Sequence, residues 1–157
     1  MLRSIIIFIN LVFFSFLGFS QDKERFMDFS YITPGEEKHN LYDIKTDYIL
    51  LYFYSPVCED CEKIKKKLIN NQSLNSLIET KRITLLAVLP DVEKEYWLDN
   101  LECVPNNWIN GWNENDREII TAYLHTVPTF FVLDKDKNIV LCPNEKEVLK
   151  WIKTISK

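Results

Sequence analysis

The stretch FYSPVCEDCEKIKKKL, residues 53–68, joins an apolar run to a lysine-rich segment and carries two cysteines at the junction. The run YILLYFY, residues 48–54, is continuously apolar, aromatic and β-branched, which is typical of a strand buried on both faces. Beyond Cys58, apolar residues recur at helical spacing: Cys61, Ile64 and Leu68. This spacing predicts a helix over residues 58–70, so the cysteine pair lies where a buried strand passes into a helix.

Two cysteines three residues apart form a redox-active pair, half of a metal site or a structural disulfide. Their position favours the first, because unpaired N–H groups and the positive dipole end at a helix N-terminus stabilise a thiolate, the attacking species in disulfide exchange. The spacing also puts both sulfurs on one helical turn, within reach of a disulfide. Cys58 is the predicted nucleophile. Cys61 begins the apolar stripe, so we expect it to be less exposed and to act as the resolving cysteine.

The N-terminal residues 1–20 predict export. Arg3 is followed by an apolar run over residues 5–19, with the small residues Gly18 and Ser20 at its end. These are the three parts of a secretory signal peptide, with cleavage after Ser20. The run of about 15 residues is shorter than the roughly 20 of a spanning helix. We therefore expect a soluble periplasmic or otherwise extracytoplasmic protein, and a retained membrane anchor is the alternative.

Residues 21–157 are enough for one domain with its own core and too few for two. The chain is 46% hydrophobic and carries 23 Asp and Glu against 19 Lys and Arg. This acidic balance argues against nucleic acid as a partner. A dense basic run lies on the outer face of the first predicted helix, where lysines are solvated: Lys63, Lys65, Lys66 and Lys67. The sequence has three glycines and no haem, flavin or phosphate-loop motif, so we expect no cofactor. We also expect a monomer.

The rest of the chain alternates strand and helix patterns. Strands are predicted over residues 29–32, 83–89, 129–133 and 138–141, and helices over residues 74–79, 93–101, 116–124 and 145–155. The strand over 29–32 is expected at a sheet edge. A polar loop is expected through Asn106, Asn107, Gly111 and Asn113. This order predicts an α/β domain with a central mixed sheet, whose first two main strands are parallel and which ends in a hairpin.

Three motifs together resemble a known family: YILLYFY, then SPVCEDC at the strand-to-helix junction, then TVPTFFVLDKDKNIV over residues 126–140. They resemble the thioredoxin fold, and more narrowly the exported TlpA-like thiol–disulfide oxidoreductases. The resemblance covers residues 29–157. It implies a thioredoxin fold with a helical insertion at residues 93–124, between the central strand and a cis-proline loop.

The resemblance also implies roles for individual residues. Cys58 matches the nucleophilic cysteine of the family and Cys61 the resolving one. Pro128 matches the cis-proline, and Val127 before it would offer its backbone to an extended substrate. The implied partners are protein thiols and disulfides. The physiological substrate stays open among cytochrome maturation, rescue of oxidised proteins, and disulfide formation or shuffling.

The chain departs from thioredoxin around the cysteines. Val57 stands in place of tryptophan, Glu59 and Asp60 in place of Gly-Pro, and Tyr52 where thioredoxin buries an aspartate. Two negative charges beside Cys58 disfavour its thiolate and oppose the effect of the helix terminus. We therefore expect a reducing or intermediate couple. In an oxidising compartment such a couple needs an electron donor, which we expect to be linked to the membrane.

Other residues have weaker indications of a role. His125 lies three residues before Pro128 and is either a proton carrier or a surface histidine, and the surface position is favoured. His39 lies in a polar turn. The tryptophans of the middle segment line a groove or, in the favoured interpretation, pack in the core: Trp97, Trp108 and Trp112.

Two questions about the cysteines stay open at this point. Cys103 and Cys142 either pair in a second disulfide or remain thiols, and their spacing does not decide between these states. The competing function is a copper or zinc carrier that binds the metal through Cys58 and Cys61. Such a site needs three or four ligands, and no further ligand pair at suitable spacing is visible in the sequence.

Overall fold

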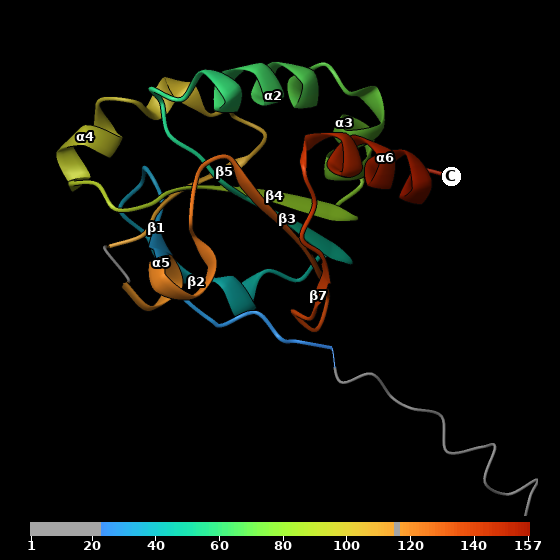
Figure 1. Ribbon diagram of the computed structural model, residues 1–157, viewed down its shortest axis with the longest axis horizontal. Coiled ribbons are helices and arrows are strands. Elements are labelled where there is room, and N and C mark those ends of the chain that lie inside the picture. The colour runs from blue at the N-terminus through green and yellow to red at the C-terminus, as the bar shows by residue number, and fades with distance from the viewer. Residues whose placement is uncertain (1–22, 115–116) are drawn as a thin grey trace, which may run out of the picture.

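The computed structural model describes residues 23–114 and 117–157 (Figure 1). The expected signal peptide lies outside the described residues. In the described part, seven strands form one mixed sheet in the order β2-β1-β5-β4-β3-β6-β7. Their bounds are β1 Ser30–Ile32, β2 Lys38–Asn40, β3 Tyr48–Phe53, β4 Ile83–Leu89, β5 Ile109–Trp112, β6 Thr129–Asp134 and β7 Ile139–Leu141. The predicted α/β class and mixed central sheet are confirmed.

Strand β3 lies in the middle of this sheet. It pairs in parallel with β4 and antiparallel with β6, and Tyr52 stands opposite Ala87 and Phe130. Because side chains alternate along a strand, Leu50 and Tyr52 face one apolar cluster while residues 49, 51 and 53 face another. Both faces of β3 are therefore buried, as its continuous apolar run indicates.

Helices cover both faces of the sheet. Three of them lie along one face in Figure 1: α2 (Glu59–Ile69), α3 (Gln72–Glu79) and α6 (Glu145–Ile155). The opposite face carries α5 (Arg117–Tyr123), which contributes the buried Ile119. α2 and α3 are two separate helices. Asn71 caps the start of α3, because its side chain accepts the N–H of Leu74. None of the helices within residues 23–114 and 117–157 is both long and apolar enough to cross a membrane.

The last helix begins where its sequence predicts. The side chain of Asn144 accepts the N–H of Glu147, and the Glu147 carboxylate accepts the N–H of Asn144. This capping box satisfies two backbone donors that a helix N-terminus leaves unpaired. Glu145 also contacts Lys67 of α2, so an ion pair joins the two helices across the surface.

The N-terminal strand is not at the edge of the sheet. β1 pairs with β2 through the turn after Ile32, in which the Glu36 N–H donates to the Thr33 carbonyl at 2.8 Å. On its other side β1 pairs with β5 at Ile32 and Trp112. The edge position expected for residues 29–32 is therefore wrong. Strand β2, which the sequence analysis did not identify, forms that edge.

Residues 93–124 are not purely helical. They contain α4 (Lys94–Leu98), the 3₁₀ turn η3 (Leu101–Cys103), strand β5 and α5. β5 runs parallel to β4, so the polar loop expected through Gly111 is wrong at this point. A Cβ at Gly111 would lie 3.1 Å from the Tyr31 ring, so glycine allows the close packing of β1 here. Gly111 thus lies in a strand where the Tyr31 side chain packs closely against the backbone, and not in a turn.

A buried asparagine lies within the segment for which a polar loop is expected. Asn110 is 8% exposed, accepts the indole N–H of Trp97 at 2.9 Å, and donates to the Leu101 carbonyl at 3.3 Å. Trp97 in turn stacks on Trp112, with ring centroids 6.3 Å apart. All three tryptophans of this segment are buried, so core packing is their role in the fold.

We predict that Asn110→Ala destabilises the fold by about 1–3 kcal/mol, because it leaves the buried N–H of Trp97 without an acceptor. Urea denaturation followed by tryptophan fluorescence measures the change. The control is Asn107→Ala, at an exposed position three residues earlier, which should change the unfolding free energy by less than about 0.5 kcal/mol. Equal effects of the two substitutions would contradict the role given to Asn110.

Candidate active site

The chain leaves β3 and enters α2 through a short loop that ends at Cys58. The Cys58 N–H donates to the Ser55 carbonyl at 3.2 Å, and the Cys58 carbonyl accepts the Glu62 N–H at 3.1 Å. Cys58 has extended backbone angles and is the N-cap residue of α2. A partly exposed cysteine thus occupies the end of the helix where backbone donors and the positive dipole end favour negative charge.

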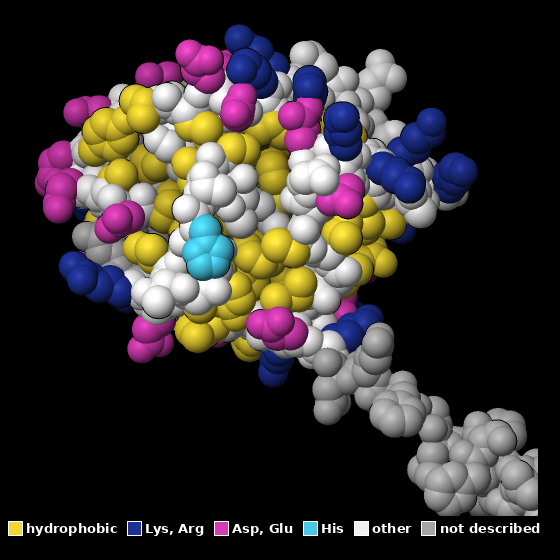
Figure 2. All heavy atoms as spheres, in the orientation of Figure 1, with side chains coloured by type: hydrophobic (Ala, Val, Ile, Leu, Met, Phe, Trp, Pro, Cys, Tyr) yellow, Lys and Arg dark blue, Asp and Glu magenta, His cyan; other side chains and the backbone are white. Residues whose placement is uncertain are grey.

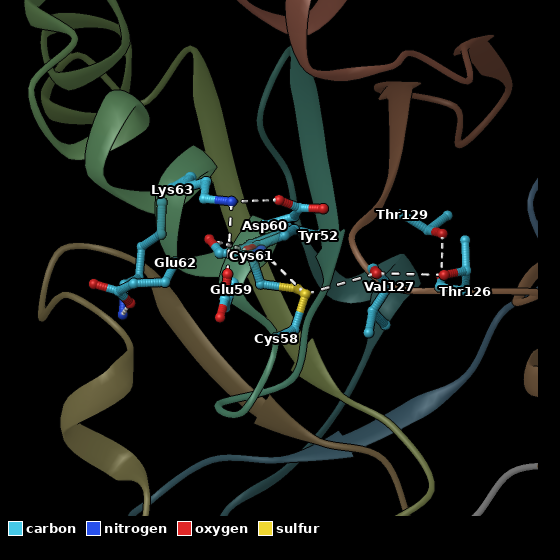
Figure 3. The surroundings of a disulfide bond; sticks show 11 residues. Tyr52, Cys58, Glu59, Asp60, Cys61, Glu62, Lys63, Thr126, Val127 and Thr129 are labelled. Atoms are coloured by element: carbon cyan, nitrogen blue, oxygen red, sulfur yellow. Dashed lines mark hydrogen bonds and ion pairs between the residues drawn. A yellow bond between two sulfur atoms is a disulfide. The ribbon is translucent and has the colours of Figure 1, made fainter.

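Cys58 and Cys61 form a disulfide, with their Cα atoms 5.2 Å apart (Figure 3). The backbone N–H of Cys61 donates to the Cys58 sulfur at 3.1 Å. Cys61 is only 2% exposed and packs in the cluster that contains Ile64 and Leu68. The expected order of exposure, Cys58 above Cys61, is confirmed. In the reduced state the same N–H would stabilise a thiolate at Cys58.

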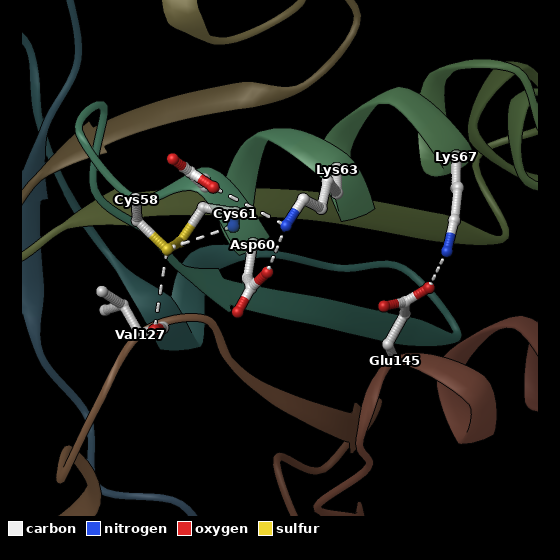
Figure 4. Close-up of polar contacts among 8 residues, drawn as sticks. Cys58, Asp60, Cys61, Lys63, Lys67, Val127 and Glu145 are labelled. Carbon is white, nitrogen blue, oxygen red and sulfur yellow. Dashed lines mark hydrogen bonds and ion pairs between the residues drawn. A yellow bond between two sulfur atoms is a disulfide. The ribbon is translucent and has the colours of Figure 1, made fainter.

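A segment far along the chain completes the surroundings of Cys58. The Val127–Pro128 peptide bond is cis, as the resemblance implies. The Val127 carbonyl oxygen lies 3.7 Å from the Cys58 sulfur, although the two residues are 69 positions apart (Figures 3 and 4). Beside it, the Thr129 hydroxyl donates to the Thr126 carbonyl at 2.6 Å. The structure therefore brings the predicted residues Cys58, Val127 and Pro128 together.

The two acidic residues between the cysteines share a counter-ion. Lys63 Nζ lies 3.0 Å from Asp60 Oδ1 and 3.8 Å from Glu59 Oε2 (Figure 3). The hydrogen bond to Asp60 raises the pKa of Lys63 above its usual value. All three side chains are exposed, so solvent screens these charges. Lys63 thus offsets part of the negative potential that the sequence analysis assigned to Glu59 and Asp60.

Charge is unevenly distributed around this site. Figure 2 shows Lys and Arg side chains gathered toward the end of the molecule that carries α6, and Asp and Glu side chains toward α4. The lysines of α2 are mostly solvated, as expected for Lys63, Lys66 and Lys67. Lys65 differs, because its side chain is only 17% exposed and pairs with Glu62.

Tyr52 occupies the position where thioredoxin has a buried aspartate. Its hydroxyl donates to the Cys61 carbonyl at 3.0 Å, and the residue is 1% exposed. Burial raises the pKa of this phenol well above its usual value, so the hydroxyl stays protonated. In the sequence, Tyr52 stands out only as a departure from the family. Its contact with Cys61 depends on the packing of α2 over β3, which no local pattern reports.

The two other cysteines and the two histidines take no part in the contacts around Cys58 described above. Cys103 in η3 and Cys142 after β7 are free thiols, so a second disulfide between them is excluded in this structure. Burial raises the pKa of both thiols. His125 is exposed on the segment between α5 and β6, and its suggested part in proton transfer stays a prediction. His39 in β2 stacks on Tyr31 and lies 3.4 Å from Glu37.

Metal binding has little support from the described side chains. Among residues 23–114 and 117–157, no three His, Cys, Asp or Glu side chains are placed to hold a metal ion together.

Comparison with solved structures identifies the fold. A thioredoxin-like protein from Bacteroides caccae superposes with a TM-score of 0.76 at 24% identity, over 85% of this chain and 50% of that one. This chain therefore spans half the length of that protein. A conserved protein of unknown function from Bacteroides fragilis has a TM-score of 0.76 at 26% identity, over 82% of this chain and 96% of that one.

A third structure is the thioredoxin domain of a thiol–disulfide oxidoreductase from Bacteroides vulgatus. It has a TM-score of 0.69 at 18% identity and covers 86% of this chain and 97% of that domain. No protein-family model matches the sequence, and no curated protein sequence matches it significantly. The chain has a thioredoxin-like fold, with a CxxC disulfide at the start of α2 and a cis-proline beside it.

We predict that, in the reduced protein, an alkylating reagent modifies Cys58 faster than Cys61 by at least about tenfold, because Cys58 is more exposed and its thiolate is stabilised by the helix terminus. The measurement is mass spectrometry of peptides after timed exposure to iodoacetamide. The double variant Cys103→Ser, Cys142→Ser removes competing thiols and should retain the difference. Faster modification of Cys61 would reverse the assignment of the two cysteines.

Proposed function

We propose that this protein is an exported thiol–disulfide oxidoreductase that exchanges disulfides with protein substrates through Cys58 and Cys61. The observation that carries the proposal is the position of Cys58: an N-cap cysteine, bonded to a buried partner and in contact with Val127 of the cis-proline segment. Similarity to the fold of a named thiol–disulfide oxidoreductase from Bacteroides vulgatus supports it.

The chemistry follows from the two thiols in their reduced state. The Cys58 thiolate attacks one sulfur of a substrate disulfide, and the other substrate sulfur leaves as a thiolate that takes a proton from water. Cys61 then loses its proton and attacks the Cys58 sulfur. The mixed disulfide breaks, the Cys58–Cys61 bond forms, and the second substrate thiol is released. The substrate gains two electrons and the protein loses two, so the disulfide in this structure is the oxidised product.

Features around Cys58 support a protein as the substrate. Val57, the residue before it, is 81% exposed and offers an apolar contact at the surface. Val127 presents its carbonyl oxygen beside the sulfur, where an extended backbone can pair with it. A polypeptide around its cystine presents both apolar side chains and backbone N–H groups, which match these two features.

We propose that the couple is on the reducing side, with a membrane-linked thiol donor returning electrons to it. Glu59 and Asp60 add negative charge near Cys58, which opposes the thiolate and so disfavours the reduced form. Lys63 offsets part of this negative charge. The Cys61 N–H acts in the opposite direction to the two acids, because it favours the Cys58 thiolate. We expect a potential nearer thioredoxin's roughly −270 mV than the roughly −120 mV of a strong oxidant.

Glu59→Gln, Asp60→Asn should raise the potential by roughly 10–30 mV, because removing both charges stabilises the Cys58 thiolate and hence the reduced form. Equilibration with dithiothreitol or glutathione buffers measures it. The matched control, Glu79→Gln, Asp136→Asn, removes two exposed charges far from Cys58 and should leave the potential unchanged. A wild-type potential close to that of the strong oxidants, or no rise in the first variant, would refute the reducing assignment.

Substrate trapping tests the function itself. In an exporting host, Cys61→Ser should accumulate mixed disulfides between Cys58 and protein partners, because the second step is blocked. Mass spectrometry identifies the partners and should find the mature chain beginning at Gln21. Adding Cys58→Ser should abolish the adducts. Absence of adducts from Cys61→Ser, together with stoichiometric copper or zinc in the purified wild type, would favour the metal-carrier alternative.

A further inference from the structure

A chain of two hydrogen bonds runs from the centre of the sheet to the Cys58 sulfur. The Tyr52 hydroxyl donates to the carbonyl of Cys61 at 3.0 Å, and the N–H of the same Cys61 donates to the Cys58 sulfur at 3.1 Å. Figure 3 shows Tyr52, Cys61 and Cys58 close together at the start of α2. The backbone of Cys61 is therefore bonded on one side to the sheet and on the other to the reactive sulfur.

Tyr52 is held rigidly in place. It stands in β3 opposite Ala87 and Phe130, and its ring stacks on Phe130 with centroids 4.6 Å apart and planes 5° from parallel. Trp108 meets the same ring edge-on at 6.4 Å. A buried phenol packed against two aromatic rings has little freedom to move its hydroxyl, so it can hold the Cys61 carbonyl at a fixed point.

We propose that Tyr52 is a positioning residue of the oxidoreductase: its hydroxyl fixes the Cys61 backbone so that the Cys61 N–H stays directed at the Cys58 sulfur. This rests on the proposed function. Two consequences follow. The N–H favours the Cys58 thiolate in the first step, and the fixed backbone keeps the Cys61 sulfur within reach of Cys58 in the second. Unlike a buried carboxylate, the phenol takes no proton from Cys61.

The chain contains a matched control for this proposal. Tyr54 is the next residue of the same strand face, is 3% exposed, and lies 5.7 Å from Tyr52 between ring centroids. Its hydroxyl is buried, and within the described residues it has no hydrogen-bond partner. Each substitution of tyrosine by phenylalanine removes one buried oxygen. Only the Tyr52 hydroxyl is hydrogen-bonded to the Cys61 carbonyl.

The test compares Tyr52→Phe with Tyr54→Phe, both in the Cys103→Ser, Cys142→Ser background. The rate of iodoacetamide modification against pH reports the thiolate of Cys58. Loss of the Tyr52 hydroxyl should raise the pKa of Cys58 by about half a unit, a threefold fall in thiolate below that pKa. A mixed disulfide of Cys58 with thionitrobenzoate should also release its coloured thiolate about threefold more slowly. Tyr54→Phe should leave both readouts unchanged.

Each outcome decides the proposal. A folded Tyr52→Phe with an unaltered Cys58 pKa and release rate, or equal shifts in both variants, overturns it. If Tyr52→Phe does not fold, 3-fluorotyrosine at position 52 keeps the hydroxyl and makes it a stronger donor, and the Cys58 pKa should then fall. Both readouts use small reagents, so they remain valid even if trapping finds no protein substrate and the proposed function fails.

Discussion

The burial of β3 on both faces is the constraint on which the rest of this structure depends. A strand with Leu50 and Tyr52 on one side and Phe53 on the other requires a packed layer above and below it. Helices α2, α3 and α6 supply one layer, while α5 and the N-terminal segment supply the other. Because α2 follows β3 directly, covering the sheet also places the first turn of α2, and with it Cys58, at the end of the central strand.

The same pairing brings together two segments that are distant in sequence. β6 runs antiparallel to β3, with Thr129 opposite Phe53, so the residues just before β6 lie beside the loop just after β3. This register explains why the Val127 carbonyl lies 3.7 Å from the Cys58 sulfur. The Cys58 sulfur thus lies between one backbone N–H from its own helix and one backbone carbonyl from the segment just before β6, and both are positioned by the sheet.

The electrostatics of Cys58 reflect opposing effects. Backbone donors at the start of α2 favour its thiolate, the exposed Glu59 and Asp60 disfavour it, and Lys63 offsets part of their charge. Exposed charges are screened, whereas the N–H bonded to the sulfur is not. The buried N–H therefore acts on this thiol alongside the acidic residues, and its direction depends on the support that Tyr52 gives to the Cys61 backbone.

The sequence by itself determined β3, α2, β4, the β6–β7 hairpin and α6, because each is encoded by a local apolar period or cap. It also determined the cysteine pair, whose roles follow from its place at the start of a helix, and the proline segment, whose role rests on a resemblance. Tertiary structure alone decided the position of β1 inside the sheet, the existence of β5, and the free state of Cys103 and Cys142. Gly111 and Asn110 have loop-like residue types, yet one makes room for Tyr31 and the other bonds Trp97. Likewise, a tyrosine in an apolar strand carries no sign that its hydroxyl will meet Cys61. Contacts of this kind join residues that are separated in the sequence. They form only when the helices pack on the sheet, so no local sequence pattern predicts them.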